Sequence, residues 1–446
     1  MKFKILILVL LNLIIAKQDK FILKNLEEFK TYIIDNNFDV KFSYSEIYEK
    51  EGMLKEFIGD KSPKFNYGFN YNKEKNYSQQ NPKFNNQFSI SSETFYGLDL
   101  SLGYDRIYTN EASNLLNFKV AADISQNFLG YISRLNLDSF RNDIEISNLK
   151  KNKLINHTLV KLYRVILANN ILQTKKNKIL KFNNLMQLLK KDVQEKQQLK
   201  IISNGNEENL DSKLYSLKND LLALNSAIYE NKKNILDIVG KDKIDFKLDK
   251  QIYHNMEKTF QNGINKEINY DKSTSYLITK KVVDSLNNKI KINSSYNNFK
   301  ANVYGELSSK DLFKTKVDYK VGFNLSIPIT TSKYKGTKDQ IKAYKIRSKA
   351  ELNKIKTMQT NAFEYIRDTN QFINKRILSI NKSIELKQTY LNELNIQFNQ
   401  GRLTLNNLII AEQELLDLEI KYLDLNHQKV ILVTLFLEIF DKNLEI

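Results

Sequence analysis

Apolar and polar residues alternate along several short stretches of the chain. In residues 118–128, FKVAADISQNF, apolar side chains take every second position, and residues 319–329, YKVGFNLSIPI, show the same arrangement 201 positions later. The alternation also occurs at 65–72, 96–105 and 299–308. A period of two is typical of β-strands that have one apolar and one polar face.

Longer stretches have the spacing of helices instead. Residues 337–398 contain no proline or glycine, and their apolar residues recur at alternating intervals of three and four. These heptads predict a coiled-coil helix, which at 1.5 Å per residue is about 90 Å long. Gly401 is expected to end this helix, and the hydroxyl group of Thr404 is expected to cap the next one.

The two halves of the chain show this order of elements twice, which predicts an internal repeat. Each half has strand-like ladders, a long helix, a turn and a second helix. In the first half the long helix is expected at about 133–199, Ser203 or Asn206 caps the returning helix, and that helix ends at Gly240. The predicted organisation is a leader at 1–16, a first repeat at 17–240, a linker at 241–263 and a second repeat at 264–446.

The chain begins with MKFKILILVLLNLIIA, a basic start followed by an apolar run from Ile5 to Ala16. This run is shorter than the roughly 20 apolar residues that a membrane-spanning helix needs, and it has the length of a signal-peptide core. We therefore expect export and cleavage, with uncleaved retention as the alternative. Because no second run of spanning length follows, membrane insertion is expected to use strands.

The ladders have the length of membrane-spanning strands, about 9 to 11 residues. They also lead into helices that are too long for a compact sheet domain. Apart from the ladder at 96–105, which lies in a possible insertion, four ladders are clear, and four strands are too few for a closed barrel because the smallest spanning barrels use about eight. Copies of the chain are therefore expected to pool their strands in a ring.

Composition narrows the choice of function. The net charge is +18, but the lysines are spread along the whole chain, so a nucleic-acid partner is not expected. There is no cysteine, and the three histidines His157, His254 and His427 lack ligand spacing, so neither disulfides nor a metal site are expected. We find no nucleophile–base pair and no phosphate-binding glycine loop, so we expect no enzyme activity and no cofactor.

The chain resembles the outer-membrane efflux protein family, the TolC-type channels. The resemblance is carried by the two ladders quoted first, by NLEEFKTYIIDNN at 25–37, by SPKFNYGF at 62–69 and by FNQGRLTLNNLIIAEQELLDLEIKYLD at 398–424. It implies a mostly α fold with a small β part. Three protomers would each give four strands to a twelve-strand barrel in the outer membrane, and long antiparallel coiled-coil hairpins would form a periplasmic tunnel.

The resemblance also implies a function and a set of partners. The trimer would be a passive exit duct of a tripartite efflux or type I secretion system, working with a periplasmic adaptor and an inner-membrane transporter. Shorter helices at about 24–58 and 264–292 would stack end to end on the returning helices. The periplasmic tip would lie at the turns 200–206 and 398–404.

Several positions near these turns correspond to the family's gate and adaptor-docking positions. They are Ser203, Asn206, Phe398, Gly401, Thr404, Asn407 and Ile410. Asn407 and Ile410 take the place of an inner acidic ring, although neither is acidic, and Leu403 takes a basic position. For Gly401 and Thr404, simple helix termination and capping is an equal alternative.

Three acidic residues lie near the expected start of the returning helix in the first half of the chain. For Glu207, Glu208 and Asp211 we favour stabilisation by the helix dipole over a role in selectivity.

One segment departs from the family pattern. Residues 73–113 form an insertion, which is either an external hairpin or contains the first wall strand in its ladder at 96–105. Two other functions stay open at this point. An exported trimeric coiled-coil structural or adhesive protein would have no channel activity, and a basic nucleic-acid-binding rod would bind DNA in a salt-dependent way.

Overall fold

The computed structural model describes most of the chain in two compact units. The described residues are 22–23, 26–73, 82–108, 112–198, 205–240, 247–248, 250–265, 273–295, 300–310, 317–327 and 332–440. The units are Met1–Phe42 with Lys151–Thr274 and Thr357–Ile446, and Ser43–Lys150 with Ser275–Lys356. The expected leader at 1–16 and the cap Ser203 lie outside the described residues.

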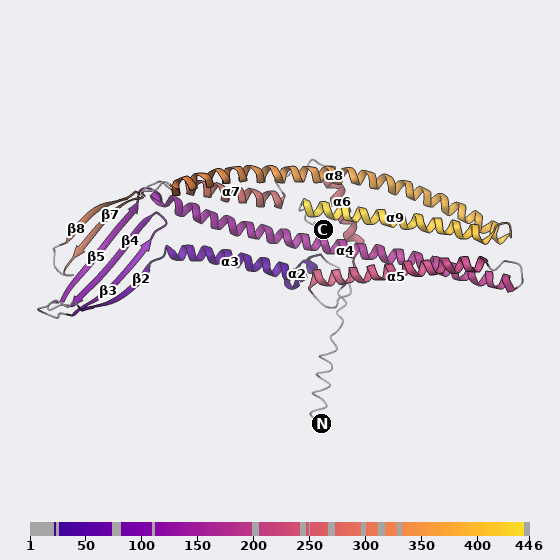
Figure 1. Cartoon of the computed structure of the whole chain (residues 1–446), viewed down its shortest axis with the longest axis horizontal. Helices are drawn as coiled ribbons and strands as arrows, with labels where there is room; N and C mark the ends of the chain where they lie inside the picture. Colours follow the sequence, from indigo (N-terminus) through magenta and orange to yellow (C-terminus); the bar gives the residue numbers. More distant parts are fainter. Residues whose placement is uncertain are drawn as a thin grey trace, which may run out of the picture. The chain divides into compact units, whose positions relative to one another are not determined.

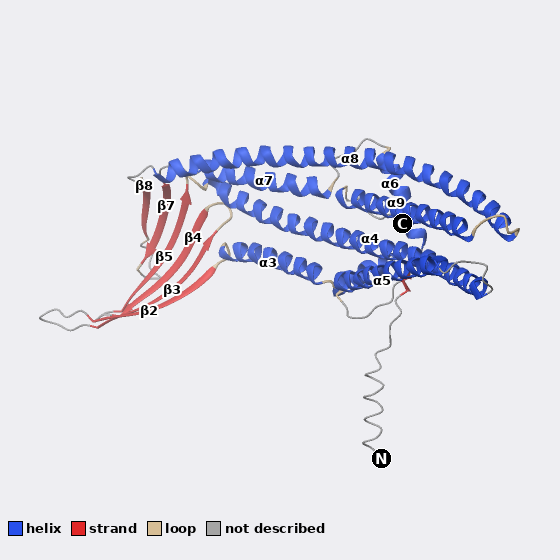
Figure 2. Ribbon diagram, turned by 45° about the vertical axis from the view of Figure 1, so that its right-hand side comes forward, coloured by secondary structure: helices blue, strands red, loops and turns tan. Residues whose placement is uncertain are grey.

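The second of these units contains one six-stranded antiparallel sheet (Figure 2). Its strands follow the order β2–β3–β4–β5–β7–β8, which is also their order along the chain; β6, which lies between β5 and β7 in the sequence, belongs to a different sheet. Their bounds are β2 Lys64–Lys73, β3 Pro82–Glu93, β4 Leu98–Tyr108, β5 Ala112–Asp123, β7 Lys300–Ser309 and β8 Asp318–Ser326. Each ladder predicted from alternation overlaps one of these strands.

The number of strands differs from the four that the sequence predicts. The ladder at 96–105 belongs mostly to β4, which pairs with β5 along its whole length. Part of the expected insertion forms β3, and β3 pairs with both β2 and β4. The strands β2 and β3 therefore form an added hairpin at one edge of the same sheet.

Two glycines allow the turns beside the sheet to touch. Gly97 follows β3, and Gly130 ends the short 3-10 helix η1, Phe128–Gly130; both have φ near +70°, at 73° and 72°. A Cβ on Gly130 would lie 1.7 Å from the carbonyl oxygen of Phe95, and one on Gly97 would lie 2.4 Å from that of Asn127. Only glycine fits this backbone conformation and this contact.

Side chains fix the passage from β5 into the long helix α4, Tyr131–Gln198. The Asp123 carboxylate accepts hydrogen bonds from the Ser125 amide at 2.8 Å and from the Gln126 amide at 3.0 Å. Asn127 donates to the Ser133 hydroxyl at 3.0 Å and accepts from the Ser133 amide at 3.2 Å. These bonds satisfy backbone donors at the start of the helix, as caps do.

Helices α3 (Phe38–Asp60) and α7 (Thr274–Ser295) pack on the part of α4 that belongs to the sheet-containing unit. The rings of Phe57 and Phe140 lie 5.2 Å apart. Lys281 forms an ion pair with Glu145 at 2.7 Å. The chain passes from α3 to β2 around Pro63.

The described part of the other unit consists mainly of helices, with a two-residue parallel pairing of β1 (Ile22–Leu23) and β6 (Lys247–Leu248). Its helices are α2 Leu26–Asn36, α5 Gly205–Val239, α6 Lys250–Ile264, α9 Leu405–Ile439, and the parts of α4 and of α8 (Ser332–Asn399) that lie beyond Lys150 and Lys356. Helices α4 and α8 have 68 residues each, and α5 and α9 have 35 each. Figure 1 shows these helices along the chain.

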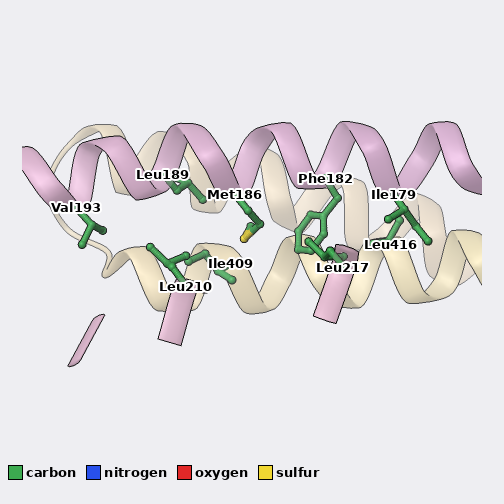
Figure 3. Close-up of a cluster of buried hydrophobic side chains, with 9 residues drawn as sticks. All are labelled: Ile179, Phe182, Met186, Leu189, Val193, Leu210, Leu217, Ile409 and Leu416. Carbon is green, nitrogen blue, oxygen red and sulfur yellow. The ribbon is translucent and has the colours of Figure 1, made fainter. Parts of the chain in front are cut away.

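A buried apolar cluster joins α4, α5 and α9 (Figure 3). It contains Ile179, Phe182, Met186, Leu189, Val193, Leu210, Leu217, Ile409 and Leu416. Phe182 and Met186 occupy its centre, one helical turn apart on α4, as heptad packing requires. The helix α6 packs on α9 through Phe260 and Phe436, whose rings lie 5.3 Å apart.

None of the described helices has both the length and the apolar character needed to cross a membrane.

Candidate functional site

The sheet has one apolar face and one polar face. Residues that pair directly across strands point to the same side, so each row of partners can be followed through the sheet. One row crosses all six strands and contains only large apolar side chains, all of them exposed; it is Phe65, Ile90, Leu102, Phe118, Leu307 and Tyr319. An exposed apolar surface of this extent indicates contact with lipid or with another protein.

The row beside it lies on the opposite face and is polar or small throughout. Its members are Asn66, Ser89, Gly103, Asn117, Ser308 and Asp318. The next row on that face brings Lys119, Glu306 and Lys320 side by side. The amino groups of Lys119 and Lys320 lie 5.3 Å and 5.8 Å from the ring centre of Tyr304. This face is suited to water.

In the helical unit, contacts between side chains join the last turns of α4 to the first turns of α5. Lys190 of α4 forms an ion pair with Asp211 of α5, and Gln194 donates to the Glu207 carboxylate at 2.6 Å. The hydrogen bond to Asp211 raises the pKa of Lys190. Glu207 and Asp211 near the start of α5 therefore have partners on α4, which the sequence alone did not indicate.

Helix α8 ends as predicted at Gly401, whose φ is 71°. The Gly401 amide donates to the Phe398 carbonyl and the Arg402 amide donates to the Gln397 carbonyl, both at 2.9 Å. This pair of bonds is a Schellman motif, which closes the last turn of a helix. Phe398 and Leu403 pack against a buried cluster of α8 and α9 that includes Leu394 and Leu408.

The predicted cap at Thr404 is only half right. Thr404 occupies the N-cap position of α9 with extended backbone angles, and its carbonyl accepts from the Asn407 amide at 3.1 Å. Its hydroxyl group makes no capping hydrogen bond, so the prediction of a side-chain cap was wrong. Asn407 and Ile410 are exposed in the first turns of α9. The side chain of Asn206 lies outside the described residues.

Ion pairs between α4 and α9 were also missed by sequence reasoning. Lys178 pairs with Glu419 at 2.7 Å, and Lys175 pairs with Asp424. Arg164 contacts Glu438 at 2.8 Å, and Glu438 also accepts from His157. The paired residues are more than 200 positions apart in the chain, so no local pattern signals them.

The contacts place four helices in the order α5, α4, α9, α8 within the helical unit, since Lys387 of α8 also pairs with Glu414 of α9. The two outer helices each expose apolar side chains seven residues apart. On α5 these are Tyr215, Leu222 and Tyr229, and on α8 they are Met358, Tyr365 and Phe372. Apolar side chains seven residues apart lie on one side of a helix, as in the heptads of a coiled coil. We call these two sets of three residues the exposed seams of α5 and α8.

Among the described residues, no group of three or more histidine, cysteine, aspartate or glutamate side chains is arranged to hold a metal ion.

Comparison with solved structures identifies the fold. No protein-family model matches the sequence, and no curated protein matches it. The outer membrane protein VceC of Vibrio cholerae superimposes with a TM-score of 0.68 and 10% identity, over 93% of this chain and 95% of that one. The chain has the fold of the TolC-type outer-membrane channels.

Two further TolC-type channel structures are similar. The Campylobacter jejuni CmeC outer membrane channel has a TM-score of 0.66 at 12% identity and covers 94% of this chain and 85% of that chain. The open state of the Neisseria gonorrhoeae MtrE outer membrane channel has a TM-score of 0.62 at 9% identity and covers 94% and 89%. The mostly helical architecture with a small antiparallel sheet, predicted from the sequence, is therefore confirmed.

Proposed function

We propose that this protein is an outer-membrane exit duct that passively conducts substrates out of the periplasm. The observation that carries the proposal is the row of six exposed apolar side chains from Phe65 to Tyr319, backed by a polar row on the other face. A sheet of this kind is stable where lipid covers one face and water the other. The similarity in fold to outer-membrane channels supports the same function.

The duct is a homotrimer in this proposal. An open sheet edge in hydrocarbon leaves backbone groups without partners, which costs several kcal/mol for each group, so the sheets of several copies close into a barrel. The exposed seams on α5 and α8 support assembly of copies, because α8 of one copy can pack on α5 of the next. The helical layers then enclose a periplasmic tunnel.

The helical turns are the docking region for a periplasmic adaptor and, through it, an inner-membrane transporter of an efflux or type I secretion system. The surface there includes Gly401, Thr404, Asn407 and Ile410, with Phe398 packed beneath it. Ser203 and Asn206 are included in this proposal on the sequence alone. Because neither Asn407 nor Ile410 is acidic, these positions provide no cation-binding ring.

Single-channel recording in planar bilayers tests the proposal. The purified protein is expected to give stepwise conductance. An inserted protein that gives no conductance would contradict it, and would favour the alternative of an exported trimeric coiled-coil structural or adhesive protein. The similarity to channel structures does not favour that alternative.

A further inference from the structure

The two edges of the described sheet are complementary in direction. The strands β2 and β8 form these edges, and every neighbouring pair in the sheet is antiparallel (Figure 2). Because the sheet has an even number of strands, β2 runs antiparallel to β8. A β8 strand of one copy can therefore pair with β2 of a second copy and continue the same antiparallel pattern.

The edges also match in length and in the character of their faces. The strand β2 has 10 residues and β8 has 9. Phe65 and Tyr67 of β2 lie on the apolar face, as do Tyr319 and Phe323 of β8, and all four side chains are exposed. Pairing of the two edges would extend the apolar face from one copy to the next without a polar interruption.

The added hairpin decides which strand forms the first edge. Ten residue pairs join β3 to β4, from Phe84 with Tyr108 to Glu93 with Asp99. On the apolar face, the ring of Phe88 lies 4.9 Å from Tyr67 and 6.5 Å from Tyr104. Since β4 pairs with β3 on one side and β5 on the other, it offers no edge to a neighbouring copy.

Contacts at the start of β2 and the end of β3 hold this hairpin against α3. Lys61, just after α3, forms an ion pair with Glu93 of β3. The Ser92 hydroxyl donates to the Lys61 carbonyl at 3.1 Å. The hairpin is therefore attached both to the sheet and to the preceding helix.

We propose that each copy contributes six strands to the wall, with β8 of one copy paired to β2 of the next. This inference rests on the proposed function. Three copies then form an eighteen-strand barrel in place of the twelve strands expected from four per chain. Because barrel diameter grows roughly linearly with strand number, the bore is about 1.5-fold wider.

Disulfide formation between introduced cysteines tests the pairing, because the chain has no cysteine of its own. Phe323→Cys on β8 is combined in turn with Phe65→Cys, Tyr67→Cys and Phe69→Cys on β2, which covers neighbouring registers on one face. A second series combines Phe323→Cys with Leu100→Cys, Leu102→Cys and Tyr104→Cys on β4. Within one chain, β8 and β4 are separated by three strand spacings, about 14 Å, and β8 and β2 lie still farther apart. Because a disulfide needs Cα atoms within about 7 Å, each of these bonds must join two copies.

The full-length variants are reconstituted in lipid vesicles, oxidised and analysed on non-reducing gels, and their conductance is recorded. We expect at least one β2 combination to give a covalent ladder that ends at the trimer, and the β4 series and Phe323→Cys alone to stay monomeric. Bonds to β4 would overturn the inference. Vesicles that conduct but show no disulfide to β2 would also overturn the inference, while leaving the proposed function intact. If the unmodified protein gave no conductance, the proposed function itself would be overturned.

Discussion

Arg164 of α4 forms an ion pair with Glu438 of α9, with Nη2 and Oε2 2.8 Å apart. The Arg164 side chain also donates to the Thr434 hydroxyl, one turn earlier on α9, at 2.8 Å. This contact joins a helix of the first half of the chain to the last helix of the second half. It is the kind of long-range contact on which the helical layer depends.

The first prediction concerns the pH dependence of this contact. The hydrogen bond from His157 and then the one from Arg164 lower the pKa of the Glu438 carboxyl from 4.5, against the opposing effect of burial. The pKa of Glu438 is lower in the folded state than in the unfolded state. The contact therefore contributes its full stabilisation of the fold above the unfolded-state pKa, and this contribution disappears as the pH falls through the folded-state pKa. Glu438→Gln should cost about 1–2 kcal/mol at neutral pH and little in acid.

Thermal unfolding in detergent at neutral and acidic pH measures this difference. Asp368→Asn is the control, because the pairing of Asp368 with Arg367 is exposed. It should change stability little at either pH. An equal loss for Glu438→Gln at both pH values would show that the charge of Glu438 is not responsible.

The second prediction tests the two faces of the sheet with neighbouring residues of β4. Leu102 lies on the apolar face and Ser101 on the polar face, near the middle of the strand. A lysine facing lipid near the bilayer midplane costs about 2–4 kcal/mol. Leu102→Lys should therefore reduce insertion into vesicles strongly, and Ser101→Lys should insert like the unmodified chain. Equal insertion of the two variants would argue against lipid on the Leu102 side.

The third prediction concerns the contact between Gly130 and the turn after β3. Gly130→Ala places a side chain at φ 72°, against the Phe95 carbonyl, so the turn must move. We expect a loss of at least about 2 kcal/mol from strain and displaced packing. Gly52→Ala is the control, because nothing lies within 4 Å of its added Cβ in α3. It should be neutral or stabilising by about 0.5–1 kcal/mol, and the comparison is made by denaturant unfolding.

The fourth prediction addresses the exposed seam of α5. Leu222→Glu should weaken assembly, because it would place a carboxylate between packed helices. Ser216→Glu is the control, since Ser216 is exposed but lies about a third of a turn away from the seam. Sedimentation in detergent should show smaller species for Leu222→Glu only. A trimer that persists in both variants would place the interface elsewhere.

Sequence periodicity predicted much of this fold because it is a local property. Heptads gave the long helices to within a few residues, and alternation located β2, β4, β5, β7 and β8. The strand β3 escaped notice, since Asn85, Asn86 and Gln87 interrupt its alternation, and its place in the sheet depends on pairing with β2 and β4. Gly401 was predicted correctly because a helix end with positive φ has a local signal.

The candidate site was less accessible to sequence reasoning. The hydroxyl cap at Thr404 failed because the type of residue at an N-cap does not fix the direction of its side chain. Lys190 and Asp211 are 21 positions apart and could be recognised as partners only once α4 and α5 were seen side by side. The roles of Ser203, Asn206, Phe398, Asn407 and Ile410 at the tip remain predictions.

Lys119, Glu306 and Lys320 stand next to one another on the polar face of the sheet. The two lysines and the one glutamate leave one net positive charge in this row, and salt screens that charge beyond about 8 Å at physiological ionic strength. A solute moving along the middle of a wide bore lined in this way would meet little net field. In the proposed duct, such a lining would select solutes by their size more than by the sign of their charge.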